Sequence, residues 1–170
     1  TGDEGTGKTT LLRLLSGDWP LSSGSVRWLE GEAAHALVPA DVYWVDPATS
    51  ARDELTVHAF SAECQSRYPG WSETAFKHWV KTLSLSEHLD KFLYMLSTGS
   101  KRKVWLAGAL AANARVTLLD EPEAALDQAS RHALRAQLTR CNKGEQGVWV
   151  VASYSCPIEG KPTQILSLGS

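Results

Sequence analysis

The stretch Gly2-Asp3-Glu4-Gly5-Thr6-Gly7-Lys8-Thr9 fits the pattern G-x-x-x-x-G-K-T. Glycines in such a loop let successive backbone N–H groups turn inward around phosphate oxygens. Lys8 can reach the β- and γ-phosphates of a nucleotide, and the Thr9 hydroxyl can ligate Mg²⁺. The helix that follows would point its positive end at the same anion. The same short pattern can also occur in a glycine-rich turn that caps a helix. The other motifs of the chain must therefore show whether this loop binds a nucleotide.

The composition is that of one globular domain. The 170 residues suffice for a sizeable hydrophobic core. No apolar run approaches the ~18 residues of a membrane span. The formal net charge of −2 gives no general attraction to nucleic acid, and three widely spaced cysteines are typical of free thiols. The basic run Lys101-Arg102-Lys103 is interpreted as the solvated face of a helix.

The beginning of the chain lacks an element that such a loop normally has. A buried strand usually leads into the phosphate-binding loop, but here the loop starts at the second residue. The first residue is also not methionine. We therefore expect a single domain over residues 1–170 from which the N-terminal strands are missing.

The apolar periodicity predicts helices that alternate with short strands. Helices are predicted from residue 8, over 56–67, from 72 to about 83, from about 100, and over 131–138. Strands are predicted at 25–29, 42–45, 116–119, 148–152 and 164–168. Such alternation implies an α/β fold with a mostly parallel sheet. The strand-free part, about 56–113, is expected to be an inserted α-helical subdomain.

A second motif joins the apolar run 116–119 to a pair of acids, Asp120 and Glu121. A buried strand that ends in acids delivers carboxylates to the sheet edge where open α/β folds bind ligands. Asp120 would hold Mg²⁺ through water, and Glu121 would orient and polarise the attacking water. The alternative is an acidic helix N-terminus favoured by the helix dipole. The phosphate-binding loop in the same chain favours the catalytic interpretation.

A third motif, Leu96-Ser97-Thr98-Gly99-Ser100, precedes a predicted helix. A serine and a glycine there offer a hydroxyl and unobstructed N–H groups to an anion. By itself this would be an ordinary capped turn. Its place upstream of Asp120, and the segment Ala125-Leu126-Asp127 soon after Glu121, give it more weight.

With these motifs in this order, the chain resembles the nucleotide-binding domain of an ABC-type ATPase over essentially its whole length. The resemblance implies a P-loop NTPase core with a mostly parallel sheet and an inserted helical subdomain, and it implies ATP and Mg²⁺ as ligands. The matching segments are the Walker A loop at 2–9, the LSGGQ signature at 96–100, Walker B at 116–121 and the D-loop at 125–127.

The resemblance also assigns roles to individual residues. In this family each ATP is sandwiched between the Walker A loop of one subunit and the signature of another. The implied nucleotide-binding residues are Gly2, Asp3, Glu4, Gly5, Thr6, Gly7, Lys8, Thr9, Thr10, Ser97, Thr98, Gly99, Ser100 and Asp127. The implied catalytic residues are Glu121, Lys8 and Tyr154, and the implied metal ligands are Thr9, Asp120 and, more weakly, Asp46.

The partners follow from the same resemblance. The segments 53–57 and 68–72 are most similar to the short subunits of ABC-2-type exporters. The family implies a peripheral subunit at the cytoplasmic face of the membrane. Its implied partners are a second ABC ATPase subunit, identical or different, and a transmembrane permease. Nucleic acid is not an implied partner. Two alternatives stay open: a nucleotide-gated module with little hydrolysis, and a soluble ABC ATPase of DNA repair or translation.

The chain departs from the family pattern at two switch positions. Asp46-Pro47 stands where the Q-loop glutamine is expected, and Tyr154 stands where the switch histidine is expected. Asp46 can still ligate Mg²⁺, since hard cations accept carboxylates. Tyr154 offers one neutral donor, which bonds a phosphate more weakly than a charged donor does. We therefore expect ATP binding to be intact and hydrolysis to be slow.

Overall fold

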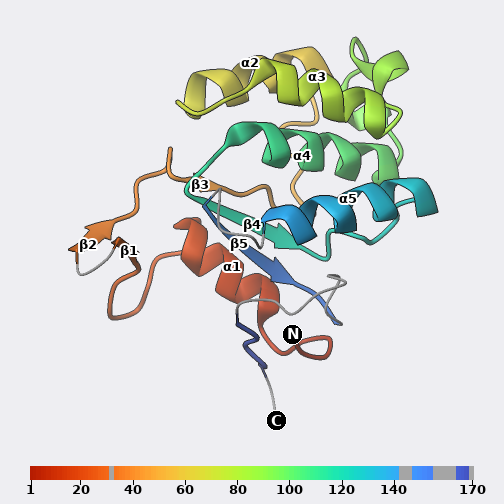
Figure 1. The fold of residues 1–170 in the computed structure, drawn as a ribbon. Coiled ribbons are helices and arrows are strands. Elements are labelled where there is room, and N and C mark those ends of the chain that lie inside the picture. The colour runs from red at the N-terminus through yellow and green to blue at the C-terminus, as the bar shows by residue number, and fades with distance from the viewer. Residues whose placement is uncertain (31–32, 142–146, 155–163, 169–170) are drawn as a thin grey trace.

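The computed structural model describes residues 1–30, 33–141, 147–154 and 164–168. At its centre lies a parallel sheet in the order β3-β4-β5, built from Val42–Tyr43, Val116–Asp120 and Val148–Ala152. One face is covered by α1 (Lys8–Ser16), and the other by α4 (Thr98–Ala112) and α5 (Gln128–Cys141) (Figure 1). The predicted α/β class with a parallel sheet is thereby confirmed.

β3 and β4 bury side chains on both faces, which alternate along each strand, whereas most of β5, at the end of the strand order, is only half-buried. Val42 and Leu118 pack with Leu12 of α1 in one apolar cluster. Tyr43 and Leu119 belong to the larger cluster that the helices of the other face complete. The apolar run 116–119 therefore becomes a strand buried between two helical layers, and the run 148–152 becomes a partly exposed strand beside it.

A further helical layer lies outside α4 (Figure 1). It contains α2 (Val57–Arg67) and α3 (Glu73–Thr82), followed by the 3₁₀ turns η1 (Ser86–His88) and η2 (Leu93–Met95). Within the described ranges, no helix combines the length and the apolarity that crossing a bilayer requires.

Three helices begin at hydroxyl caps. The hydroxyls of Thr56, Ser72 and Ser97 each accept a hydrogen bond from the N–H three residues further on, at 3.1, 3.2 and 3.1 Å. Such a cap satisfies one of the free N–H groups of the first helical turn. The caps of Thr56 and Ser72 stand where the sequence predicts helix starts, and Ser97 sets the start of α4 slightly earlier than expected.

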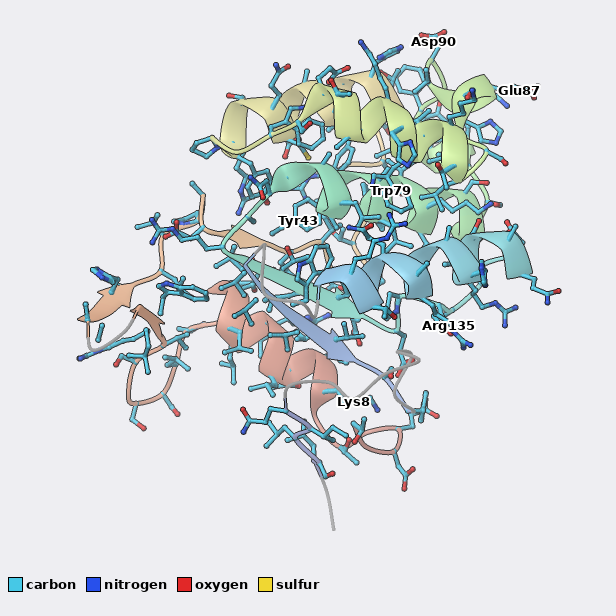
Figure 2. All side chains as sticks on the ribbon, viewed as in Figure 1. Lys8, Tyr43, Trp79, Glu87, Asp90 and Arg135 are labelled. Carbon is cyan, nitrogen blue, oxygen red and sulfur yellow. The ribbon has the colours of Figure 1, made fainter. Side chains whose placement is uncertain are left out.

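Helix α4 is fixed against the sheet by a close approach to β3. The Tyr43 hydroxyl donates to the Trp105 carbonyl at 2.7 Å, and Figure 2 shows Tyr43 between the sheet and α4. A Cβ at Gly108 would lie 2.5 Å from that hydroxyl oxygen. The absence of a side chain at Gly108 therefore lets the helix pack this near, which sets the position of every side chain on α4.

The structure differs from the sequence-based expectation at two strands. β1 (Arg27–Glu30) pairs antiparallel with β2 (Ala33–Ala36), whose exposed side chains give no apolar pattern to detect. The predicted strand at 164–168 is wrong. Thr1 donates to the Leu166 carbonyl at 2.6 Å and accepts from the Leu168 N–H at 2.9 Å, and pairing with one residue does not make a strand.

Candidate functional site

The loop before α1 adopts left-handed backbone at two of its glycines. Gly5 has φ +78° and Gly7 has φ +91°, and Gly7 is the residue that precedes the first turn of α1. Left-handed residues next to a helix start form a concave arrangement of N–H groups that binds anions. Asp3, Glu4 and Thr6 lie in the same loop, and Thr10 follows on α1.

Lys8 lies at the beginning of α1 and bends back over the loop (Figure 2). Its ammonium donates to the carbonyls of Gly2 at 2.6 Å and Asp3 at 2.8 Å. It also lies 4.4 Å from the centroid of the Tyr154 ring, within reach of a cation–π contact. Only 9% of Lys8 is exposed, so the loop holds a nearly buried cation where the phosphates of a nucleotide would bind.

Thr9 and Asp120, separated by 111 positions in the sequence, meet at the carboxyl end of β4. The Thr9 hydroxyl donates to Asp120 Oδ2 at 2.6 Å. Hydroxyl and carboxylate oxygens are the ligand types that Mg²⁺ prefers. This donor set fits the metal that the sequence motif implies.

Asp46 does not join that pair. Its carboxylate forms an ion pair with Arg13 at 2.6 Å and accepts from the Ala48 N–H at 2.9 Å. Arg13 lies one helical turn after Thr9 on α1. Because Arg13 neutralises this carboxylate, the geometry gives no support to the prediction of Asp46 as a weak metal ligand.

Glu121 follows directly after β4 in a conformation that is unusual for its residue type. Its φ is +43°, and its N–H donates to the Ala152 carbonyl of β5 at 2.9 Å. Oxygen Oε1 of the carboxylate is buried and has no hydrogen-bond partner among the described residues. Burial raises the pKa of Glu121, and the Lys8 charge opposes that rise. A buried carboxylate oxygen without a partner fits a role in holding a water.

Arg102 of α4 is a site residue that the sequence analysis missed. Its guanidinium donates to the carbonyl of Asp120 at 3.2 Å and also to that of Glu121. Its neighbour Lys101 pairs with Asp53 at 2.6 Å, and Lys103 pairs with Asp127. The interpretation of this basic run as a solvated face is therefore wrong. Consecutive helical residues point about 100° apart, so each cation reaches a different segment.

The signature segment lies beside the D-loop segment of the same chain. Ser97 caps α4, Thr98 is the first residue of that helix, and Ser97 Oγ lies 3.0 Å from Ser100 Oγ. A Cβ at Gly99 would lie 2.5 Å from the Ala125 carbonyl oxygen. Only glycine fits this contact without a shift of one of the two segments.

Asp127 is held in place from two sides. It accepts from the Ser130 N–H at 2.8 Å, as a helix cap does, and from the Lys103 ammonium. These bonds, above all that from Lys103, hold the pKa of Asp127 well below its usual range. Asp127 is therefore a fixed carboxylate at the edge of the signature segment.

The predicted residues form two groups in the structure. Lys8, Thr9, Asp120, Glu121 and Tyr154 gather at the carboxyl ends of β4 and β5. The signature residues and Asp127 gather at the beginning of α4, which lies on the other face of the sheet from α1 (Figure 1). Arg102 connects the second group to the first.

Sequence similarity relates the chain to known proteins. Residues 1–124 match the sequence model of the family described as ABC transporter. A cytochrome c biogenesis ATP-binding export protein, CcmA, of Albidiferax ferrireducens is 30% identical, with 98% of this chain and 81% of that protein aligned. A sulfate/thiosulfate import ATP-binding protein, CysA, of Gloeobacter violaceus is 35% identical, with 82% and 42% aligned.

The same likeness holds for the fold. The solved structure of an ATP-binding subunit of an ABC transporter has a TM-score of 0.72 at 20% identity, over 89% of this chain and 65% of that one. The chain spans about three fifths of the length of several curated relatives that it matches.

Proposed function

Because the chain belongs to the ABC transporter family, we propose that it binds and hydrolyses ATP and that ATP-driven closure of a dimer moves a separate transmembrane subunit. The observation that carries the proposal is the pairing of Thr9 with Asp120 at 2.6 Å, next to the buried oxygen of Glu121. This arrangement supplies a metal site and a base at the edge of one phosphate-binding loop.

Each residue of this group has a distinct task in the proposal. The loop N–H groups and Lys8 bind the phosphates, and Thr9 and Asp120 hold Mg²⁺, which when bound offsets the charge of the phosphates. Glu121 orients and polarises the attacking water. Tyr154 lies beside Lys8 and offers its hydroxyl as a neutral donor.

The separation of the two groups supports a composite site. Within one chain, the signature segment begins α4, which covers the face of the sheet opposite to α1, the helix that follows the Lys8 loop (Figure 1). We propose that the signature segment of a second ABC ATPase subunit, identical or different, contacts the nucleotide bound by this chain. Asp127 would lie at the interface between the two subunits. Such a dimer would work at the cytoplasmic face of a membrane. The assignment to exporters rests on segments 53–57 and 68–72, since the two curated relatives are named for export and for import.

Replacing Ser97 with Ala tests the composite site against a matched control, Ser72→Ala. Both serines accept the same kind of cap bond, from the N–H three residues further on, so each change should lower stability by about 1 kcal/mol, or Tm by about 2–4 °C. Only Ser97→Ala should also weaken ATP-dependent dimerisation, by roughly tenfold or more, because a bond to a charged phosphate is lost. Analytical ultracentrifugation with ATP measures this, and equal dimerisation of the two variants would contradict the proposed role of the signature.

Phosphate release with and without the membrane subunit tests the coupling. We expect slow steady-state release by the full-length protein and faster release in the complex, with Lys8→Ala as the inactive control. If ATP binds but is not hydrolysed, with or without the membrane subunit, a nucleotide-gated module would be favoured. This module is the second candidate because Asp46 and Tyr154 stand at the two switch positions. A rate that the membrane subunit leaves unchanged would favour a soluble ABC ATPase.

A further inference from the structure

The basic run of α4 connects this helix to three different segments of the molecule. Lys101 reaches Asp53, and Lys103 reaches Asp127. Between them, Arg102 reaches the end of β4, where its guanidinium donates to the carbonyls of Asp120 and Glu121. Arg102 thus ties the helix that begins at the signature to the backbone of the proposed base.

The backbone of Glu121 needs such support. A φ of +43° is disfavoured for a residue with a side chain and persists only where the surroundings hold it. On one side, the Glu121 N–H donates to Ala152 at 2.9 Å. On the other side, the Glu121 carbonyl accepts from the Ala124 N–H at 3.0 Å and from Arg102. Backbone hydrogen bonds therefore hold Glu121 on both sides, and Arg102 adds a side-chain bond on the carbonyl side.

The chemistry of the guanidinium suits this task. Both bonds come from one terminal nitrogen, Nη1, whose two N–H groups lie in the plane of the guanidinium, whereas the donors of an ammonium rotate freely. Burial lowers the pKa of Arg102, and the charges of Asp120 and Glu121 oppose that change. Arginine stays charged in proteins, so a half-buried cation is kept where it bonds two carbonyl oxygens.

The position of Arg102 is itself well defined. The backbone carbonyl of Trp105, one turn further along α4, accepts a hydrogen bond from the buried Tyr43 hydroxyl at 2.7 Å. The close packing of Gly108 against the same tyrosine fixes the helix over the sheet. A side chain on such a helix can hold a partner more precisely than one on a free loop.

We propose that Arg102 is a positioning residue for Glu121: by holding the carbonyls of Asp120 and Glu121, it fixes the backbone that aims the Glu121 carboxylate at the attacking water. The inference rests on the proposed function, in which Glu121 polarises that water. Arg102 acts through Glu121, so it should affect the rate of the chemical step and not the binding of ATP.

The test compares Arg102→Gln, Arg102→Lys and the matched control Lys101→Gln in the full-length protein. Arg102→Gln should lower kcat by roughly tenfold to a hundredfold, because a small displacement of a catalytic group has effects of this size. KM and the affinity for a fluorescent ATP analogue should change by less than about twofold, since the phosphate contacts stay intact. Arg102→Lys should have a higher kcat than Arg102→Gln but a lower one than the native protein. Lys101→Gln, which loses an ion pair on the same helix, should have the native kcat.

Several outcomes would overturn the inference. Equal kcat in Arg102→Gln and Lys101→Gln would show that the carbonyl contacts do not matter. A parallel loss of ATP affinity would place Arg102 in binding. If Arg102→Gln lowers Tm strongly, the double variant Arg102→Gln/Glu121→Gln is compared with Glu121→Gln alone. A residue that acts through Glu121 should not lower kcat further once the carboxylate is gone, so a lower kcat in the double variant would contradict the inference.

The single variant Glu121→Gln separates this inference from the proposed function. Full turnover in Glu121→Gln would show that the base is misassigned, and the proposed mechanism would fail. Loss of turnover in Glu121→Gln together with full turnover in Arg102→Gln would leave the mechanism intact and overturn only the role of Arg102.

Discussion

Replacing Glu121 with Gln should lower ATP turnover by about 10²–10⁴-fold, the range that a general base contributes. The amide has the size of the carboxyl group, so the conformation at φ +43° can be kept. It cannot accept a proton, however, and it removes the charge that polarises water. The Lys8 loop and the Thr9–Asp120 pair are untouched, so ATP binding should stay within about twofold of the native value. Single-turnover kinetics and titration with a fluorescent nucleotide measure the two effects separately.

Glu123→Gln is the matched control for this prediction. Glu123 lies two residues further along and forms a two-point ion pair with Arg135, at 2.7 Å for both bonds. The control therefore removes a nearby carboxylate charge without touching the proposed base, and its turnover should stay close to the native rate. The Glu121→Gln protein should still dimerise with ATP, because the signature of the second subunit is intact. Undiminished hydrolysis in Glu121→Gln would show that another group activates the water.

The parts of the fold that the sequence predicts well are those set by local chemistry. Ser72 caps α3 where its position before an apolar-periodic segment indicates a helix start. The apolar run before Asp120 becomes β4, because such a run can be buried on both faces only in the middle of a parallel sheet. The glycines of the loop adopt the left-handed backbone that the phosphate-binding pattern requires. Each of these features depends on a few neighbouring residues.

The parts that the sequence does not predict depend on how α1 and α4 lie against the sheet and the segments beside it. The role of Arg102 is one of them, because three consecutive basic residues give no sign of which one faces β4. The contact of Gly99 with Ala125 is another, since it joins segments that are far apart in the chain. The residue type of Asp46 predicts a metal ligand, but its carboxylate forms an ion pair with Arg13. Long-range packing, which leaves no local pattern, decides all three.

Replacing Tyr154 with His should raise kcat, by up to about 10²-fold, the effect of one donor that stabilises charge in a transition state. Tyr154 follows β5 and places its ring 4.4 Å from the Lys8 ammonium. Burial and the carboxylates of Glu4 and Glu121 raise the pKa of its phenol, so the hydroxyl is a neutral donor near pH 7. A histidine at this place titrates near neutrality and can donate a charge-assisted bond to the γ-phosphate. Steady-state phosphate release by the full-length protein measures the change.

Tyr154→Phe shows which part of the native side chain matters. It keeps the ring beside Lys8 and removes only the hydroxyl, so ATP affinity should be retained if the ring supports the lysine through its π face. Turnover in Tyr154→Phe should not exceed the native rate, since no donor is gained. A gain in Tyr154→His that is absent in Tyr154→Phe would attribute slow hydrolysis to the missing imidazole. A histidine variant that is no faster than the native protein would place the limit elsewhere, and the Asp46-Pro47 segment would then be the next position to change.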